Sequence, residues 1–114
     1  MFLSVIIITL NEVKSLAKTI SSVKEATRIS KKCSISAEII ISDGGSNDGT
    51  IPLANKLGDL VVNSPPGRYK QLNAGARAAR GDVLLFLHED TVLTRSAIFR
   101  IFWKMKDPRV VGRA

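Results

Sequence analysis

Two apolar runs that each stop at an acidic cluster most constrain what this chain can fold into. Residues 39–41 are all isoleucine and stop at Ser42 and Asp43, and residues 83–87 stop at the sequence His-Glu-Asp of residues 88–90. Short runs of this kind predict buried strands. In open α/β sheets, ligands bind beyond the carboxyl ends of the strands. The two clusters therefore predict one acidic site at that edge of a sheet, and carboxylates there favour a divalent metal ion.

The rest of the chain alternates short apolar segments with segments of helical spacing. Strands are predicted over residues 2–9, 37–42, 59–63 and 83–87, and helices over residues 12–29, 50–58, 68–80 and from Thr94 or Ser96 to Asp107. Predicted caps are Asn11 for the first helix, Ser46 or Asp48 for the second, and Gly81 at the end of the third. Residues 109–112 have the character of a fifth strand.

This alternation predicts a Rossmann-like α/β fold, with a parallel sheet of about four strands, right-handed crossovers and helices on both faces. If the first three strands run outward in order and the fourth returns beside the first, the strand order is 3-2-1-4. The order then reverses between the first and fourth strands. Asn11, Asp43 and residues 88–90 are predicted to gather there. The length of 114 residues predicts a single domain.

Composition and charge narrow the class of protein. The chain is 45% hydrophobic and 24% charged, which is typical of a soluble globular domain. The apolar run of residues 5–8 is too short to span a bilayer, and no secretory signal is visible. The single cysteine, Cys33, cannot form an internal disulfide, which fits a reducing compartment and predicts a cytoplasmic location.

The net charge of +7 raises the question of an anionic partner, but the Lys and Arg residues are scattered along the predicted helices. We therefore expect solvated helix faces and no nucleic-acid binding, while peripheral membrane contact through these faces stays open. The motifs of P-loops, dinucleotide-binding sites, zinc clusters and serine-nucleophile elbows are all missing from the sequence.

The acidic residues differ in the roles that they can fill. Asp90 is the strongest candidate for a metal ligand, followed by Glu89, and His88 can ligate, orient a ligand or simply end a strand. Asp43 can accept hydrogen bonds from a nucleotide base or ribose. Its alternative role, a turn or cap aspartate, has weight because Gly44 and Gly45 follow it.

Three blocks of the sequence resemble a known family. SVIIITLNE of residues 4–12, EIIISDGGSNDGT of residues 38–50 and GRYKQLNAGARAARGDVLLFLHEDT of residues 67–91 are similar to the donor-binding half of family-2 glycosyltransferases with the GT-A fold. The third block is most similar to the subgroup called radical-SAM/selenodomain-associated transferase 2. The blocks occur in the family's order and cover most of the chain.

The resemblance implies a nucleotide-diphospho-sugar donor, UDP- or GDP-linked, a divalent Mn²⁺ or Mg²⁺, and inverting transfer to an unknown acceptor. By position, the implied donor-binding residues are Thr9, Asn11, Glu12, Asp43, Arg68, Asn73, Gly75 and Glu89, with Lys70 near phosphate, and the implied metal residues are Asp90 and His88. His88 stands where the family's Asp-x-Asp motif has its first aspartate, which leaves the choice of metal open.

No residue here matches the family's general base, which we expect beyond residue 114 together with the acceptor-binding half. Residues 1–114 are therefore predicted to be a donor-binding domain truncated before that half. The alternative is a catalytically incomplete remnant that serves as a nucleotide-binding or protein-interaction module. The unpaired sheet edge of such a chain predicts a homo-oligomer.

Overall fold

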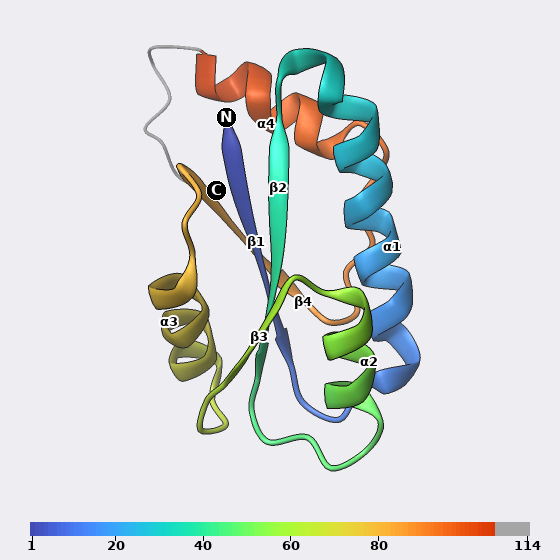
Figure 1. Cartoon of the computed structure of the whole chain (residues 1–114), viewed down its shortest axis with the longest axis vertical. Coiled ribbons are helices and arrows are strands. Elements are labelled where there is room, and N and C mark those ends of the chain that lie inside the picture. The colour runs from blue at the N-terminus through green and yellow to red at the C-terminus, as the bar shows by residue number, and fades with distance from the viewer. Residues whose placement is uncertain (107–114) are drawn as a thin grey trace.

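The computed structural model describes residues 1–106. In chain order its elements are β1 (Phe2–Thr9), α1 (Val13–Ile29), the 3₁₀ helix η1 (Ser30–Cys33), β2 (Ser36–Asp43), α2 (Thr50–Leu57), β3 (Leu60–Asn63), α3 (Arg68–Ala78), β4 (Val83–His88) and α4 (Ala97–Lys106). The strands form a parallel sheet in the order β3-β2-β1-β4, which confirms the predicted topology (Figure 1). The predicted fifth strand and the end of the last helix at Asp107 and Pro108 lie outside the described residues.

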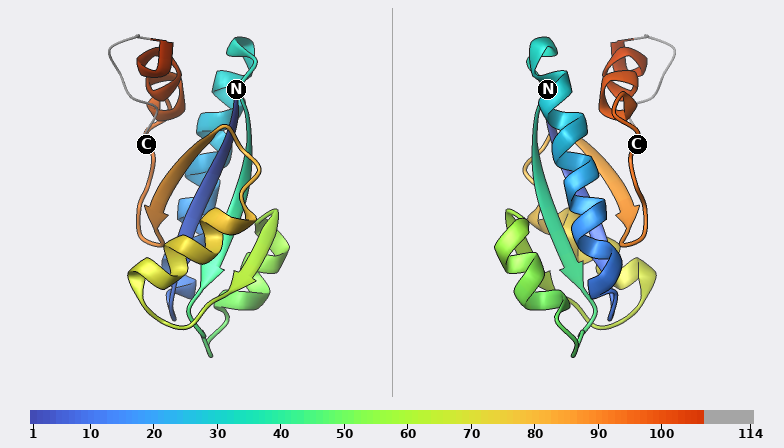
Figure 2. Two further views of the ribbon diagram at one scale, coloured as in Figure 1. Left: turned by 90° about the vertical axis from the view of Figure 1, so that its left-hand side faces the viewer. Right: turned by 90° about the vertical axis from the view of Figure 1, so that its right-hand side faces the viewer.

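Helices cover both faces of the sheet, as predicted. One face carries α1 and α2, with α4 packed against α1 and η1, and the opposite face carries α3 (Figure 2). Over the described part of the chain, no helix is both long and apolar enough to cross a membrane.

The main core lies between α1 and the sheet. Successive strand residues point to opposite faces, so Val5 and Ile7 of β1 face α1 together. Helical spacing places Leu16, Ile20 and Val23 on the side of α1 that meets them, and all five side chains are buried. Each such side chain contributes about 1.5–3 kcal/mol of transfer free energy.

The second helical layer comes unusually close to the sheet. Gly75 of α3 lies directly on Ile6, and a Cβ atom at this glycine would be only 2.4 Å from Ile6 Cγ2. Gly75 therefore lets α3 approach β1. The helix lies over β1, β2 and β3, whereas the same face of β4 is open enough to leave Phe86 39% exposed.

A buried carboxylate closes the end of the sheet where the strands begin. Glu38 Oε2 accepts hydrogen bonds from the Ser4 hydroxyl at 2.5 Å and from the Arg80 backbone N–H at 2.8 Å, and the Gly81 N–H donates to Ser4 Oγ at 2.8 Å. Burial by itself raises the pKa of the Glu38 carboxyl, but these bonds and the Arg80 guanidinium bring it below its ordinary value.

The predicted end of the third helix was wrong because of this contact. Helix α3 ends at Ala78, and Ala79 is already extended, with ψ at 141°. Gly81 lies beyond the helix and is pressed against β1, where an added Cβ would be 2.7 Å from the Ser4 nitrogen. The glycine serves a close approach of two backbones and does not terminate the helix.

Candidate functional site

The loops after β1 and β2 are joined by Asn11. Its backbone N–H donates to Ser46 Oγ at 2.8 Å, and its Oδ1 accepts from the Asn47 N–H at 2.8 Å. Asn11 has a φ of 52°, a left-handed conformation that asparagine adopts more readily than most residues. The predicted cap was therefore wrong, because the N-cap of α1 is Glu12, without a side-chain cap bond.

The N-cap of α2 is Gly49, so neither residue predicted as its cap holds that position, and of Ser46 and Asp48 only Asp48 bonds the start of the helix. Asp48 Oδ1 accepts from the Thr50 N–H at 2.9 Å and from the Thr50 hydroxyl, and its Oδ2 accepts from the Val13 N–H at 3.3 Å. Asp48 thus accepts hydrogen bonds from the first residue of α1 and the first residue of α2. Ser46 instead bonds Asp43 and Asn11.

Asp43, at the end of β2, is fully buried and makes four hydrogen bonds. Its Oδ1 accepts from the hydroxyls of Thr9 at 2.8 Å and Ser46 at 2.6 Å, and its Oδ2 accepts from the N–H groups of Gly45 at 2.9 Å and Ser46 at 2.7 Å. Burial raises the pKa of this carboxyl, but the bonds from Ser46, Thr9 and Gly45 outweigh it, so the net pKa lies below its ordinary value. In this geometry Asp43 organises the turn, and its contact with a nucleotide base stays a prediction.

Gln71 of α3 is a structural residue of the site that the sequence reasoning missed. Its Nε2 donates to the carbonyl oxygens of Thr9 at 2.8 Å and Ser42 at 3.0 Å, and its Oε1 accepts from the Gly67 N–H at 3.2 Å. The Ser42 hydroxyl donates back to the Gln71 carbonyl at 2.6 Å. Gln71 therefore ties the ends of β1 and β2 to the start of α3. Its spacing from Gly75, one turn later on the same buried face, was the available signal.

A pocket of about 270 Å³ lies where the sheet order reverses, between the ends of β1 and β4 and the start of α3. Its lining residues are Ile8, Thr9, Leu10, Gly67, Arg68, Gln71, His88 and Glu89. A smaller apolar hollow beside it shares Arg68 and His88 and adds Leu72 and Phe86. The structure thus brings together four of the residues singled out in the sequence, namely Thr9, Arg68, His88 and Glu89.

The other predicted site residues lie outside this lining. Asp43 is buried beneath Thr9, and Asn11 and Glu12 are exposed on the loop after β1. Asp90 is exposed on the turn after β4, one residue beyond Glu89. In α3, Asn73 and Lys70 are exposed, while Gly75 is buried against Ile6. Their roles in binding stay predictions.

Negative charge gathers at the end of β4. Half-buried Glu89 has a pKa raised above its ordinary value, first by burial and then by the carboxylates of Glu12 and Asp90, while His88 acts in the opposite direction. Within residues 1–106, no three His, Cys, Asp or Glu side chains form a ready-made metal cage. The donor set still fits Mg²⁺ or Mn²⁺, because these ions commonly take one or two carboxylates and complete their coordination with substrate phosphates.

The fold and the pocket together define a Rossmann-like α/β domain with a pocket lined by polar side chains at the point where the strand order reverses. Residues 4–113 match glycosyl transferase family 2, and the chain belongs to that family.

Named relatives agree with this assignment. The chain is 30% identical over 96 residues to glycosyltransferase AglE of Haloferax volcanii, covering 78% of this chain and 30% of AglE. It is 37% identical over 89 residues to the uncharacterized glycosyltransferase Rv1514c of Mycobacterium tuberculosis, covering 75% of this chain and 32% of the relative. The chain thus spans about a third of the length of these curated relatives.

Solved structures share the fold. Residues 1–349 of TarS from S. aureus superpose with a TM-score of 0.77 at 21% identity, over 93% of this chain and 32% of TarS 1–349. Glucosyl-3-phosphoglycerate synthase from Mycobacterium tuberculosis, in complex with Mn²⁺, UDP-glucose and phosphoglyceric acid, superposes with a TM-score of 0.67 at 22% identity, over 94% of this chain and 40% of the synthase. The sheet of order 3-2-1-4 with its helices is therefore the GT-A arrangement.

Proposed function

We propose that residues 1–114 bind a nucleotide-diphospho-sugar with a divalent metal and supply the donor site of an inverting glycosyl transfer to an unknown acceptor. The observation that carries the proposal is the pocket that places Arg68 opposite His88 and Glu89 at the reversal of the sheet order. The similar synthase was crystallised with UDP-glucose and Mn²⁺, which supports a UDP-linked donor here, with a GDP-linked donor as the alternative. We also propose that the protein is cytoplasmic and that it belongs to the radical-SAM/selenodomain-associated transferase 2 subgroup, which its third sequence block resembles.

Each wall of the pocket has a distinct task in this proposal. Arg68 is exposed at the first position of α3, where its guanidinium and the positive helix end attract a diphosphate. On the β4 side, Glu89 and Asp90 offer carboxylate oxygens and His88 an imidazole nitrogen for Mn²⁺ or Mg²⁺. The bound metal would neutralise charge on the departing diphosphate.

The chemistry also needs a base. In an inverting transfer, the bond from the acceptor oxygen to the anomeric carbon forms as the bond to the diphosphate breaks, and the acceptor proton passes to a general base. None of the residues that line the pocket is assigned this task. We propose that the base and the acceptor site come from protein other than the residues described here, in keeping with relatives about three times as long.

A second candidate function is a catalytically incomplete module that acts through protein contacts. The observation that favours it is the open edge of β4, the outermost strand on that side of the sheet among residues 1–106. An unpaired edge promotes strand pairing between chains, so this candidate includes a homo-oligomer.

Calorimetric titration of the purified chain with UDP and with GDP, in Mn²⁺, in Mg²⁺ and then in EDTA, tests the leading proposal. We expect binding that requires the metal. Arg68→Ala should weaken nucleotide binding about tenfold, since a hydrogen bond to a charged group contributes about 1.5–3 kcal/mol. Asp90→Asn should weaken the binding of the metal and, with it, the metal-dependent binding of the nucleotide. Nucleotide binding that is absent with both metals would overturn the proposal and leave the protein-contact module.

Arg77→Ala is the matched control for Arg68→Ala. Arg77 is exposed near the other end of the same helix, away from the pocket lining. Arg77→Ala removes the same charge from the same helix as Arg68→Ala. Equal losses of nucleotide affinity from the two substitutions would therefore mean that only the general positive potential of the chain attracts the nucleotide.

A further inference from the structure

The turn after β4, which carries the candidate metal residues, is attached to the helix on the opposite side of the sheet from α3. Beyond His88 the chain runs back along α1 toward α4 (Figure 1). Three α1 side chains bond this segment: Thr19, Ser22 and Glu25. They are spaced three residues apart, so they form one stripe along the helix.

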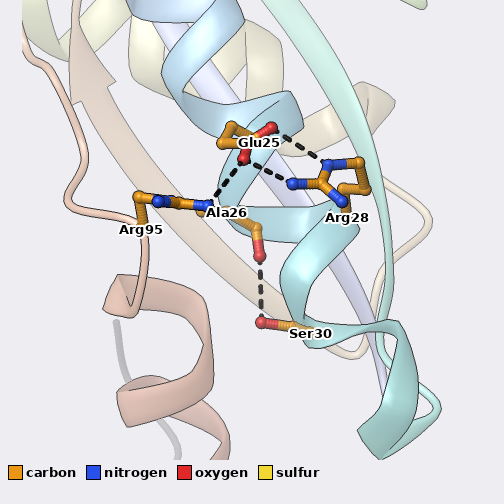
Figure 3. Close-up of polar contacts among 5 residues, drawn as sticks. All are labelled: Glu25, Ala26, Arg28, Ser30 and Arg95. Atoms are coloured by element: carbon orange, nitrogen blue, oxygen red, sulfur yellow. Dashed lines mark hydrogen bonds and ion pairs between the residues drawn. The ribbon is translucent and has the colours of Figure 1, made fainter.

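The contacts of this stripe follow the segment in order. The Thr19 hydroxyl donates to the Glu89 carbonyl oxygen at 2.6 Å, and the Leu93 N–H donates to Ser22 Oγ at 3.0 Å. Farther along, Arg95 Nη2 lies 3.4 Å from Glu25 Oε1, and Arg28 also pairs with this carboxylate, as Figure 3 shows. The two outer members of the stripe differ in burial, because Thr19 is fully buried whereas the Glu25 side chain is 39% exposed.

Thr19 is the member of the stripe that acts on the site itself. Its partner is the carbonyl of Glu89, which belongs to the peptide bond that leads into Asp90. The Thr91 N–H donates to the His88 carbonyl at 3.1 Å and closes the same turn. The turn that presents His88, Glu89 and Asp90 is thus fixed both internally and by Thr19. A buried hydroxyl bonded to this carbonyl restricts the orientation of the peptide plane and, with it, the direction of the Asp90 side chain.

We propose that Thr19 is a positioning residue for the donor site, which orients the Glu89–Asp90 peptide from α1 and so sets the metal affinity of the turn. The metal in this inference rests on the proposed function. The structural half of the inference, that Thr19 fixes the turn after β4, does not depend on that function. Partners that orient metal ligands typically change metal affinity 10–100-fold when they are removed.

Thr19→Val removes the hydroxyl and keeps the shape of the side chain, with Thr19→Ala as the substitute if valine is not tolerated. Thr27→Val is the matched control, because the Thr27 hydroxyl bonds only the Val23 carbonyl within α1, at 2.8 Å. Thr19→Ser keeps the hydroxyl and should retain wild-type behaviour. Two readouts are compared across these variants: Mn²⁺ titration in the presence of UDP, and amide hydrogen exchange without metal.

We expect Thr19→Val to weaken Mn²⁺ binding about tenfold and to speed exchange at the Thr91 and Leu93 amides, with Thr27→Val unchanged in both. Equal Mn²⁺ affinity in the Thr19→Val and Thr27→Val variants would overturn the positioning role. If the wild-type chain binds neither Mn²⁺ nor UDP, the proposed function fails. The exchange readout then decides the structural half alone, and unchanged exchange in Thr19→Val overturns that half as well.

Discussion

Asp43 has no exposed surface, yet it is ionised in the folded chain, because donors from three neighbouring residues surround its two oxygens. A buried carboxylate is tolerated only when it is bonded in this way. The residue therefore stabilises the loop that borders the candidate donor site. Its contribution to folding depends on pH, and the sign follows from the lowered pKa.

Asp43→Asn should be less stable than the wild-type chain at pH 7 by about 1–3 kcal/mol, because an amide nitrogen would replace one acceptor oxygen among N–H and O–H donors. The folded-state pKa lies below the ordinary value of 3.8. The stability that the carboxylate contributes is therefore fully present above that value and is lost as the pH falls through the folded-state pKa. Urea unfolding between about pH 2 and 7 should show a shallower acid loss in the variant.

Asp82→Asn is the control for this measurement, since Asp82 is exposed and an amide oxygen can still accept its one bond, from the Phe2 N–H at 3.1 Å. Its unfolding free energy should follow that of the wild-type chain across the same pH range. An Asp43→Asn variant that loses stability toward acid as steeply as the wild-type chain would contradict the assigned origin of the pH dependence.

At the residue scale, sequence spacing predicted the edge at which polar side chains meet but not their roles. Thr9, His88 and Glu89, at the ends of β1 and β4, line one pocket, and Arg68 joins them from the start of α3. Whether Asp43 faces a ligand or its own loop depends on the path of that loop, including the left-handed backbone of Asn11. Nothing in residue spacing predicts such a path, and so the Asn11 cap was wrong. Gln71 was missed although its spacing from Gly75 offered a signal.

At the scale of elements, the strands and helices were predictable because their apolar periodicities are strong. All four strands and their order match the prediction within a residue or two at each end. The prediction was wrong where a contact distant in sequence overrides a local signal. Ala79 and Arg80 are residue types that favour helix, but the bonds of Arg80 and Gly81 to Glu38 and Ser4 end α3 at Ala78.

The packing of α3 on β1 gives a prediction at this scale. Gly75→Ala should destabilise the chain by about 1–3 kcal/mol, because the new methyl group would overlap Ile6 Cγ2. Ile6→Ala should cost about 2–5 kcal/mol by leaving a cavity. The double variant should cost less than the sum, since the alanine methyl at position 75 occupies part of that cavity. Urea denaturation of the four proteins measures the coupling, and simple additivity would contradict direct packing of Gly75 on Ile6.

At the scale of the whole molecule, the two edges of the sheet differ. β3, on one side, has only four residues, and short edge strands resist pairing between chains. β4, on the other side, has six residues and the exposed ring of Phe86. In the part of the chain that the structure describes, β4 is therefore the edge at which further protein is most readily added.

Phe86→Lys should weaken self-association of the chain by placing a charge on the open face of β4. Sedimentation velocity over a concentration series should show the wild-type chain shifting to larger species and the variant shifting less. Leu60→Lys on β3 is the matched control, because Leu60 is 42% exposed at the opposite edge. A wild-type chain that stays monomeric throughout the series would contradict this use of the β4 edge.

The polar pairs at the two ends of β1 and β2 also determine how these strands can align. Both strands are rich in isoleucine, and a slip of two residues would again set isoleucine beside isoleucine on the same face. The end pairs favour the native alignment: Ser4 lies opposite Glu38 and Thr9 opposite Asp43, each pair joined by a hydrogen bond. A slipped sheet would bury two carboxylates without these hydroxyl donors. The Thr9–Asp43 bond beside the site and the Ser4–Glu38 bond at the other end of the sheet therefore both discriminate against misaligned folding of a repetitive pair of strands.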